Sequence, residues 1–184
     1  MAEHYLSTVI TSAVVATIAG ALINAWLESR RERHSTRFEA LSAAVTLEGY
    51  AITCAEAISH NDIAEQSLGH AGAFMGSVPE FPTISVPAGF LKPEKAKVAD
   101  KLMVFPQEIR QADQWVGLQW DFTAEVEAVR EAAVEQSAQM GLSAIELASN
   151  IRKAFNLPER KLIFGVFDVE KTLRKALREV QDNA

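Results

Sequence analysis

The chain is poor in the residues that mark several protein classes. Its 184 residues include a single cysteine, Cys54, which excludes a disulfide-stapled secreted module. The 9 glycines and 6 prolines follow no period and 48% of the residues are hydrophobic, which excludes collagen-like and disordered classes. The net charge of −6 lacks the basic excess of a dedicated nucleic-acid binder, so we expect no nucleic acid among its partners.

Motifs for nucleotide, metal and nucleophile chemistry are also missing. The sequence contains no GxxxxGK[ST] loop, HExxH, CxxC or GxSxG pattern. The one local cluster of metal-ligand types is His60, Asp62, Glu65 and His70. Within it, His60-Asn61-Asp62 fits better as the end of a helix followed by a capping residue, and Cys54 is typical of a small core residue. We therefore predict a non-enzymatic protein with no catalytic, cofactor-binding or metal site.

Charge is absent from residues 5–27, a run of 23 positions that raises the mean hydropathy of the chain to +0.02. As a helix this run is about 34 Å long, enough to cross a hydrocarbon core of about 30 Å. Tyr5 and Trp26 stand at its two ends, where aromatic rings favour the headgroup region. We predict a transmembrane anchor over 5–27, with 1–4 as a short extracytoplasmic N-terminus. The lipid bilayer is then the first partner.

The flanks of this run predict its orientation and weigh against two alternatives. No lysine or arginine precedes it, whereas Arg30, Arg31 and Arg33 follow it, so the positive-inside rule places the C-terminal side in the cytoplasm and the N-terminus outside. A cleaved signal peptide carries its basic residues before the apolar run, and a buried core helix seldom stays uncharged for so long. We expect an inner-membrane, single-pass protein with Tyr5, Trp26 and these arginines at the interfaces.

Small or polar residues recur every four positions within the predicted anchor. They are Thr8, Ser12, Ala16, Gly20 and Asn24. In lipid, such a stripe allows close backbone approach and hydrogen bonds between helices. It is a candidate helix–helix contact, either homo-oligomeric or with another membrane protein, although an alanine-rich anchor also produces such stripes by chance.

Residues 28–184 read as an all-α domain, a cytoplasmic antiparallel bundle with one long irregular connection. No proline interrupts the sequence up to Ser59, so the anchor and this segment form one helix from about Tyr5 to about Ser59. The glycines and prolines of 60–92 predict a connection about thirty residues long. Its apolar residues fit a loop packed over the bundle, and a partner-binding or lid segment is the alternative.

Helical patterning returns after Pro93, a residue typical of a first helical turn. The apolar spacing continues through Val116 and Trp120, with Pro106 as an interruption, and 121–156 lacks proline, with Gly141 as its weak point. A last helix is expected over 166–180, with Val166 at the start of its apolar face. Its basic side, Lys171, Arg174, Lys175 and Arg178, indicates either a solvated face or contact with a membrane surface.

These patterns predict a membrane-anchored, non-enzymatic interaction or assembly module at the cytoplasmic face of a bacterial membrane. The layout resembles that of many small bacterial membrane proteins, and its motifs identify no family. Two alternatives remain open. A membrane-active effector, such as a phage or toxin-type lysis factor, also carries a moderately polar single span. A ligand-sensing regulatory subunit would use Trp115, Trp120 and Phe122 as its pocket, although aromatic residues at helical spacing are usually core. The anchor stripe and 60–92 are the predicted contact surfaces.

Overall fold

The computed structural model of the chain describes residues 2–84, 86, 90 and 93–183, with side chains left out at 2–22, 32–33, 94, 181 and 183. Its helices are α1 (Ala2–Gln66), η2 (Pro93–Lys95), α2 (Ala96–Thr123), α3 (Val126–Ala154) and α4 (Val169–Asn183). The two strands, β1 (Ile163–Phe164) and β2 (Phe167–Asp168), form one antiparallel hairpin. The predicted all-α fold is confirmed, and the hairpin is an addition that the sequence reading missed.

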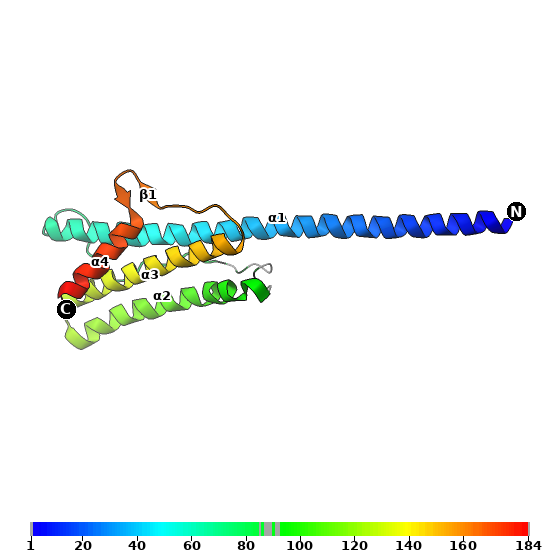
Figure 1. The fold of residues 1–184 in the computed structure, drawn as a ribbon. Coiled ribbons are helices and arrows are strands. Elements are labelled where there is room, and N and C mark those ends of the chain that lie inside the picture. The colour runs from blue at the N-terminus through cyan, green and yellow to red at the C-terminus, as the bar shows by residue number, and fades with distance from the viewer. Residues whose placement is uncertain (1, 85, 87–89, 91–92, 184) are drawn as a thin grey trace.

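The helix α1 is a single continuous rod of 65 residues, about 98 Å long at the usual rise per residue. Figure 1 shows its N-terminal part extending well beyond the other helices. One helix through 5–59 was expected, and the structure carries it further, to Gln66. The cap expected at His60-Asn61-Asp62 is therefore wrong, because these residues lie inside the last turns of α1 and Asn61 is buried.

After α1 comes the connection 67–92, whose described residues, 67–84, 86 and 90, return along the bundle toward the start of α2. As a result α1 and α2 run in the same direction and α3 runs opposite to both (Figure 1). The expected antiparallel bundle is corrected on this point. The return path explains the length of the connection, because the chain must travel back along α1 before α2 can begin. A short turn would have made the first two helices antiparallel neighbours.

Two expected interruptions are absent, and one unexpected break is present. α2 continues through Pro106, since Phe105 and Ile109 on either side of it are buried. α3 continues through Gly141, whose added Cβ would lie 2.9 Å from Leu173 Cδ1. The break between α2 and α3 instead falls at Ala124, which has a left-handed φ of 54° and donates its backbone N–H to Trp120 O.

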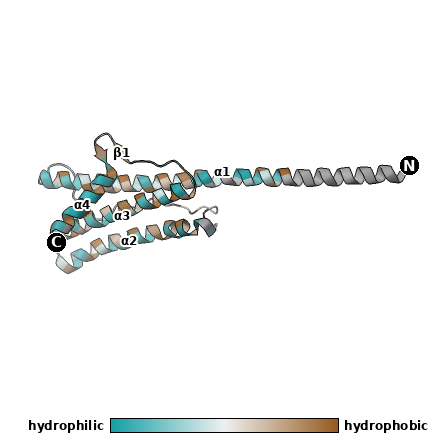
Figure 2. Ribbon diagram, viewed as in Figure 1, coloured by the Kyte–Doolittle hydropathy of each residue, from teal (hydrophilic) through white to brown (hydrophobic). Residues whose placement is uncertain are grey.

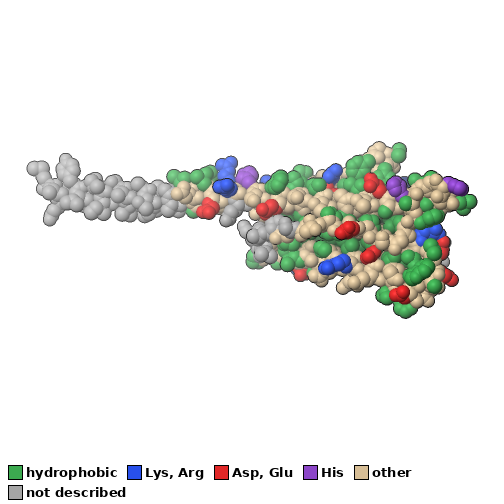
Figure 3. All heavy atoms as spheres, turned by 180° about the vertical axis from the view of Figure 1, so that it is seen from behind, with side chains coloured by type: hydrophobic (Ala, Val, Ile, Leu, Met, Phe, Trp, Pro, Cys, Tyr) green, Lys and Arg blue, Asp and Glu red, His purple; other side chains and the backbone are tan. Residues whose placement is uncertain are grey.

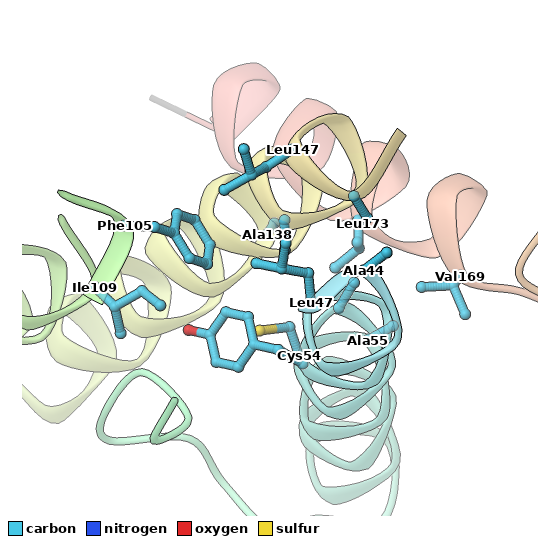
Figure 4. Close-up of a cluster of buried hydrophobic side chains, with 14 of the residues drawn as sticks. Ala44, Leu47, Cys54, Ala55, Phe105, Ile109, Ala138, Leu147, Val169 and Leu173 are labelled. Atoms are coloured by element: carbon cyan, nitrogen blue, oxygen red, sulfur yellow. The ribbon is translucent and has the colours of Figure 1, made fainter. Parts of the chain in front are cut away.

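The core is built around α3, which contacts α1, α2 and α4. Figure 4 shows Leu47 and Cys54 of α1, Phe105 and Ile109 of α2, and Leu173 of α4 converging on it. Alanines fill much of this contact, and the fully buried ones include Ala40, Ala44, Ala51, Ala55, Ala133, Ala138 and Ala144. Small side chains let helices approach closely, and larger side chains such as Tyr50, Phe90 and Phe105 fill the wider parts of this core.

Candidate interaction surface

The C-terminal part of the predicted anchor is exposed on the projecting section of α1. Ile23, Trp26 and Leu27 stand clear of the bundle, Asn24, Arg30 and Arg31 are exposed beside them, and the guanidinium of Arg30 lies 5.5 Å from the Trp26 ring centroid. In Figure 2 hydrophilic residues follow these apolar ones toward the bundle. The remaining predicted anchor and stripe side chains, Tyr5, Thr8, Ser12, Ala16, Gly20 and Arg33, lie outside those that the structure describes.

No helix among the described residues carries a stretch long and apolar enough to cross a membrane. Residues 5–22 of the predicted anchor are not among the side chains to which this finding applies.

The connection 67–92 is held against the bundle by two polar side chains, the buried Asn61 of α1 and the exposed Asp113 of α2. The buried side chain of Asn61 accepts a hydrogen bond from Met75 N at 3.0 Å and donates one to Glu65 Oε1 at 2.8 Å. Further along, Asp113 Oδ1 of α2 accepts a hydrogen bond from Val78 N at 3.0 Å. These bonds fix the connection between α1 and α2, so backbone polar groups that leave water are satisfied.

Most apolar side chains of the connection point into the bundle. Val78 and Phe90 are buried, and the Phe81 ring stacks edge-on against Tyr50 at 5.1 Å and Phe105 at 5.3 Å between ring centroids. Phe74 is half exposed, under the guanidinium of Arg130 at 4.8 Å from the ring centroid. The packed-loop interpretation fits this arrangement. The alternative, a partner-binding or lid segment, stays a prediction, and Phe74 and Leu68 are the exposed apolar side chains it could use.

An exposed apolar stripe runs along the opposite flank of α2. We call Val104, Trp115, Leu118 and Phe122 the α2 stripe, since at 3.6 residues per turn they fall within about 60° on the helix. Trp115 is 48% exposed and Phe122 is 74% exposed. Figure 3 shows several hydrophobic patches on the bundle surface at the end away from the projecting helix. Glu108 and Gln111 lie on the same face between Val104 and Trp115, so the contiguous apolar part of the stripe comprises Trp115, Leu118 and Phe122. Contiguous exposed apolar patches are typical of interaction surfaces.

A groove of about 380 Å³ separates the α2 stripe from α3. Its lining residues are Glu108, Gln111, Ala112, Trp115, Gln136, Met140 and Ser143. One carboxylate and no lysine or arginine line it, and Trp115 and Met140 form its apolar walls. Four of the seven lining residues are polar, so the groove offers both hydrogen-bonding groups and a limited apolar surface.

The predicted aromatic ligand pocket does not form. Trp120 is about half exposed and Phe122 projects into solvent, while Trp115 alone of the three lines the groove. Trp120 was expected to point inward with Ile109 and Val116, yet the buried face of α2 ends at Val116. The part of α2 that packs against the bundle ends at Val116. Its last two turns extend past this contact, so their aromatic side chains are exposed.

Two buried titratable groups of the core, the Cys54 thiol and the Tyr50 hydroxyl, are held in their neutral forms. Burial raises the pKa of the Cys54 thiol to about 12, and it raises the pKa of Tyr50 well above its ordinary range. A protonated, buried thiol is a poor nucleophile, so Cys54 acts as a core residue. Asp62, part of the local cluster considered for metal binding, has its pKa raised mainly by partial burial. Among the described residues no group of three or more His, Cys, Asp or Glu side chains is placed to hold a metal ion.

A buried ion pair that sequence reasoning missed ties α1 to α3. Arg152 donates to Glu48 through Nε at 2.6 Å and Nη2 at 3.0 Å, and Arg160 reaches Glu48 Oε2 at 3.2 Å. Arg152 also donates from Nη1 to Pro158 O at 2.9 Å. Glu48 is only 4% exposed. Because 104 residues separate Glu48 from Arg152, no local sequence pattern indicates their pairing. The one available signal is a glutamate on the apolar face of a helix, because a buried carboxylate needs a cationic partner.

The basic side of α4 is exposed, an arrangement that fits both a solvated face and contact with a membrane surface. Arg174 pairs with Glu170 at 2.7 Å, and Lys175 lies 3.4 Å from Glu179 and 3.9 Å from Asp62. The helix packs on the core through Val169, Leu173 and Ala176, while Val166 sits at the exposed hairpin turn. Val166 is therefore removed from the predicted apolar face.

Comparisons of the chain with protein-family models, curated proteins and solved structures found no match. The functional argument below therefore rests on the residues and geometry of this chain.

Proposed function

We propose that this chain is a membrane-anchored, non-enzymatic interaction module. In this proposal residues 5–27 span the inner membrane of a bacterium, the N-terminus is outside, and the bundle within 28–184 is held at the cytoplasmic face. The anchor stripe, Thr8 to Asn24, contacts a second copy or another membrane protein, and the α2 stripe contacts a partner in the cytoplasm.

The continuity of α1 carries this proposal. A helix that projects tens of ångströms from its bundle gains no tertiary packing there, and isolated helices are marginal in water. A bilayer supplies the missing environment, because residues 5–27 carry no charge and lipid favours a fully hydrogen-bonded helix. Trp26 and Arg30 stand at the expected boundary, where aromatic and basic side chains are enriched.

Membrane flotation after a carbonate wash tests the anchor. The full chain should float with vesicles, and a Val15→Asp/Ile18→Asp variant should shift to the soluble fraction, because a charge at the centre of a span costs about 2.5–3.5 kcal/mol. The matched control is Phe38→Asp/Leu41→Asp, placed at exposed positions of α1 nearer the bundle. If the Val15→Asp/Ile18→Asp variant floats as well as the control, the anchor is overturned. A C-terminal reporter active only outside the cytoplasm would overturn the orientation.

Site-specific photocrosslinking in native membranes tests the interaction surface. A probe at Trp115 should give a discrete adduct, and a probe at Arg110, which is exposed on a different side of α2, should not. Adducts of equal yield at both positions would remove the α2 stripe from the proposal. The Trp115→Gln/Phe122→Gln variant should lose the adduct formed by a probe at Leu118 while keeping the helical content of the chain.

A further inference from the structure

The charge of the bundle is polarised along its length. The end at which α1 enters comprises 28–39, 93–101 and 146–156, which together contain nine basic and six acidic residues. The basic ones are Arg30, Arg31, Arg33, Arg37, Lys95, Lys97, Lys101, Arg152 and Lys153, of which Arg152 is buried and paired with Glu48 and so adds no surface charge. The far end comprises 56–66, 121–135 and 174–183, with ten acidic and four basic residues. The net charge of −6 therefore hides a basic end and an acidic end.

Contacts among three helices bring the basic residues to one place. Arg37 of α1 donates to Asn156 O, just after α3, at 3.0 Å. Lys95 Nζ lies 3.8 Å from the ring centroid of Phe155, which closes α3. Lys97 and Lys101 follow on the first turns of α2 and are exposed. We call this surface the basic end.

Helix stability does not account for the basic end. Positive charge is favoured at the C-terminus of a helix and disfavoured at its N-terminus. α3 obeys this preference, with Glu127 in its first turn and Arg152 and Lys153 in its last. α2 has no acidic residue in its first turn and no basic residue in its last, and its lysines lie at the unfavourable terminus. Lys101 Nζ lies 3.7 Å from Glu146 Oε1 of α3, and both side chains are largely exposed. An anionic partner would offset the unfavourable position of these lysines.

We propose that the basic end binds the anionic headgroup surface of the membrane to which α1 anchors the chain. The proposal rests on the membrane anchor proposed above. From Leu27 to Arg37 the helix rises about 15 Å, and the headgroup layer occupies roughly 5–8 Å of that distance. The gap that remains is comparable to the Debye length of about 8 Å at physiological ionic strength, so exposed lysines there feel the lipid charge. On α1 the acidic end begins at residue 56, more than about four helical turns beyond Ala40, and lies at the opposite end of the bundle.

Resonance energy transfer to a lipid-borne acceptor tests this contact in the full chain. A donor dye is placed at Met103→Cys, near the basic end, or at Val126→Cys, at the acidic end, both exposed positions. Cys54 is buried and stays unlabelled in the folded chain. In phosphatidylglycerol-containing vesicles the Met103→Cys signal should exceed that in pure phosphatidylcholine by roughly twofold and fall at high salt, because the attraction is screened beyond a Debye length.

The charge variant Lys97→Glu/Lys101→Glu should remove this difference between the two lipids. The matched control, Lys171→Glu/Arg174→Glu on α4, makes the same charge change away from the basic end and should retain it. A milder pair, Lys97→Gln/Lys101→Gln, should reduce the difference by half and guards against misfolding. Flotation with equal transfer in both lipids would overturn the headgroup contact and leave the anchor intact. A chain that fails to float would overturn the anchor itself.

Discussion

Residues 40–64 of α1, the packed half, contact the other helices, whereas the side chains described within 23–39, the free half, are nearly all exposed. The packed half presents alanines to its neighbours, and Ala40, Ala44, Ala51 and Ala55 are completely buried. The free half has local support instead, such as the hydrogen bond from Ser35 Oγ to Glu39 Oε1 at 3.2 Å. The packed half therefore stabilises the domain, whereas the free half sets how far α1 extends beyond the bundle.

The two halves also teach where helix order comes from. An exposed pair or hydrogen bond on a helix contributes a few tenths of a kcal/mol, which does not nucleate a helix alone. The free half is helical because the packed half has already nucleated the rod, and propagation then needs only good helix formers. Changes in one half should consequently differ from the same changes in the other.

Removal of the Glu48 carboxylate should have the largest effect. Glu48→Leu leaves Arg152 buried without its partner, which costs about 3–5 kcal/mol of unfolding free energy. Urea unfolding of the full chain, followed by circular dichroism, measures this cost. Glu28→Leu in the free half should change stability by less than about 0.5 kcal/mol. The double variant Glu48→Leu/Arg152→Met should recover most of the loss, and a double variant as unstable as the single one would contradict the explanation.

A proline scan should separate the halves next. Ser29 and Ser42 are both exposed serines of α1, one in each half. Ser42→Pro should lower the unfolding free energy of the bundle by about 3 kcal/mol, because proline removes a hydrogen bond within the packed rod. Ser29→Pro should bend the free half and leave the bundle's unfolding midpoint unchanged. Equal losses in the two variants would show that the halves fold as one unit.

Two glycine-to-alanine changes sharpen the role of close packing. An added Cβ at Gly141 meets Leu173 Cδ1 at 2.9 Å and Cys54 Cβ at 3.2 Å, so Gly141→Ala should destabilise the chain by about 1–3 kcal/mol. At Gly49 of α1 nothing lies within 4 Å, so Gly49→Ala should stabilise it by up to about 1 kcal/mol through helix propensity. Thermal melts of both variants provide the comparison, and a stabilised Gly141→Ala would mean that α3 and α4 do not meet there.

Alkaline pH should weaken the packed half by a smaller, graded amount. The pKa of Cys54 is raised from 9.0 to about 12, so the unfolded chain loses this proton first and is favoured as pH rises. Unfolding free energy should therefore be constant below about pH 9 and then fall by up to ~1.4 kcal/mol per pH unit for this group. In Cys54→Ala the decline between pH 9 and 10 should be shallower, and an identical slope would assign it to other groups.

The sequence predicted the elements better than their directions. The proline-free run to Ser59 and Pro93 correctly placed two helices, because propensity and caps act locally. The break at Ala124 carries no glycine or proline, and Gly141 sits in an unbroken helix. Both outcomes depend on tertiary contacts: the turn after Thr123 forms where the packing of α2 ends, and the glycine is required by Leu173.

The candidate surface was only partly predictable for the same reason. Trp115, Trp120 and Phe122 stood out in the sequence, but only the position of α3 makes Trp115 line a groove and leaves Phe122 exposed. The apolar residues of 67–92 have the composition of a binding segment. Most of those that the structure describes pack against the core, because polar side chains such as Asn61, more than ten residues away along the chain, hold the connection in place. Pairings across such distances leave no periodic signal.

The unbroken α1 also fixes an angular phase. Each residue of an α-helix turns the chain by about 100°, so one residue inserted in the free half would swing the α2 stripe by about that angle around the α1 axis. Seven inserted residues would raise the bundle by about 10 Å and return it nearly to its original heading. A partner that binds the α2 stripe while it is fixed beside the N-terminal section of α1 must therefore match two things. These are the distance of the stripe along the α1 axis and its angle around that axis. The length of the free half therefore sets both the distance and the orientation at which the partner can bind.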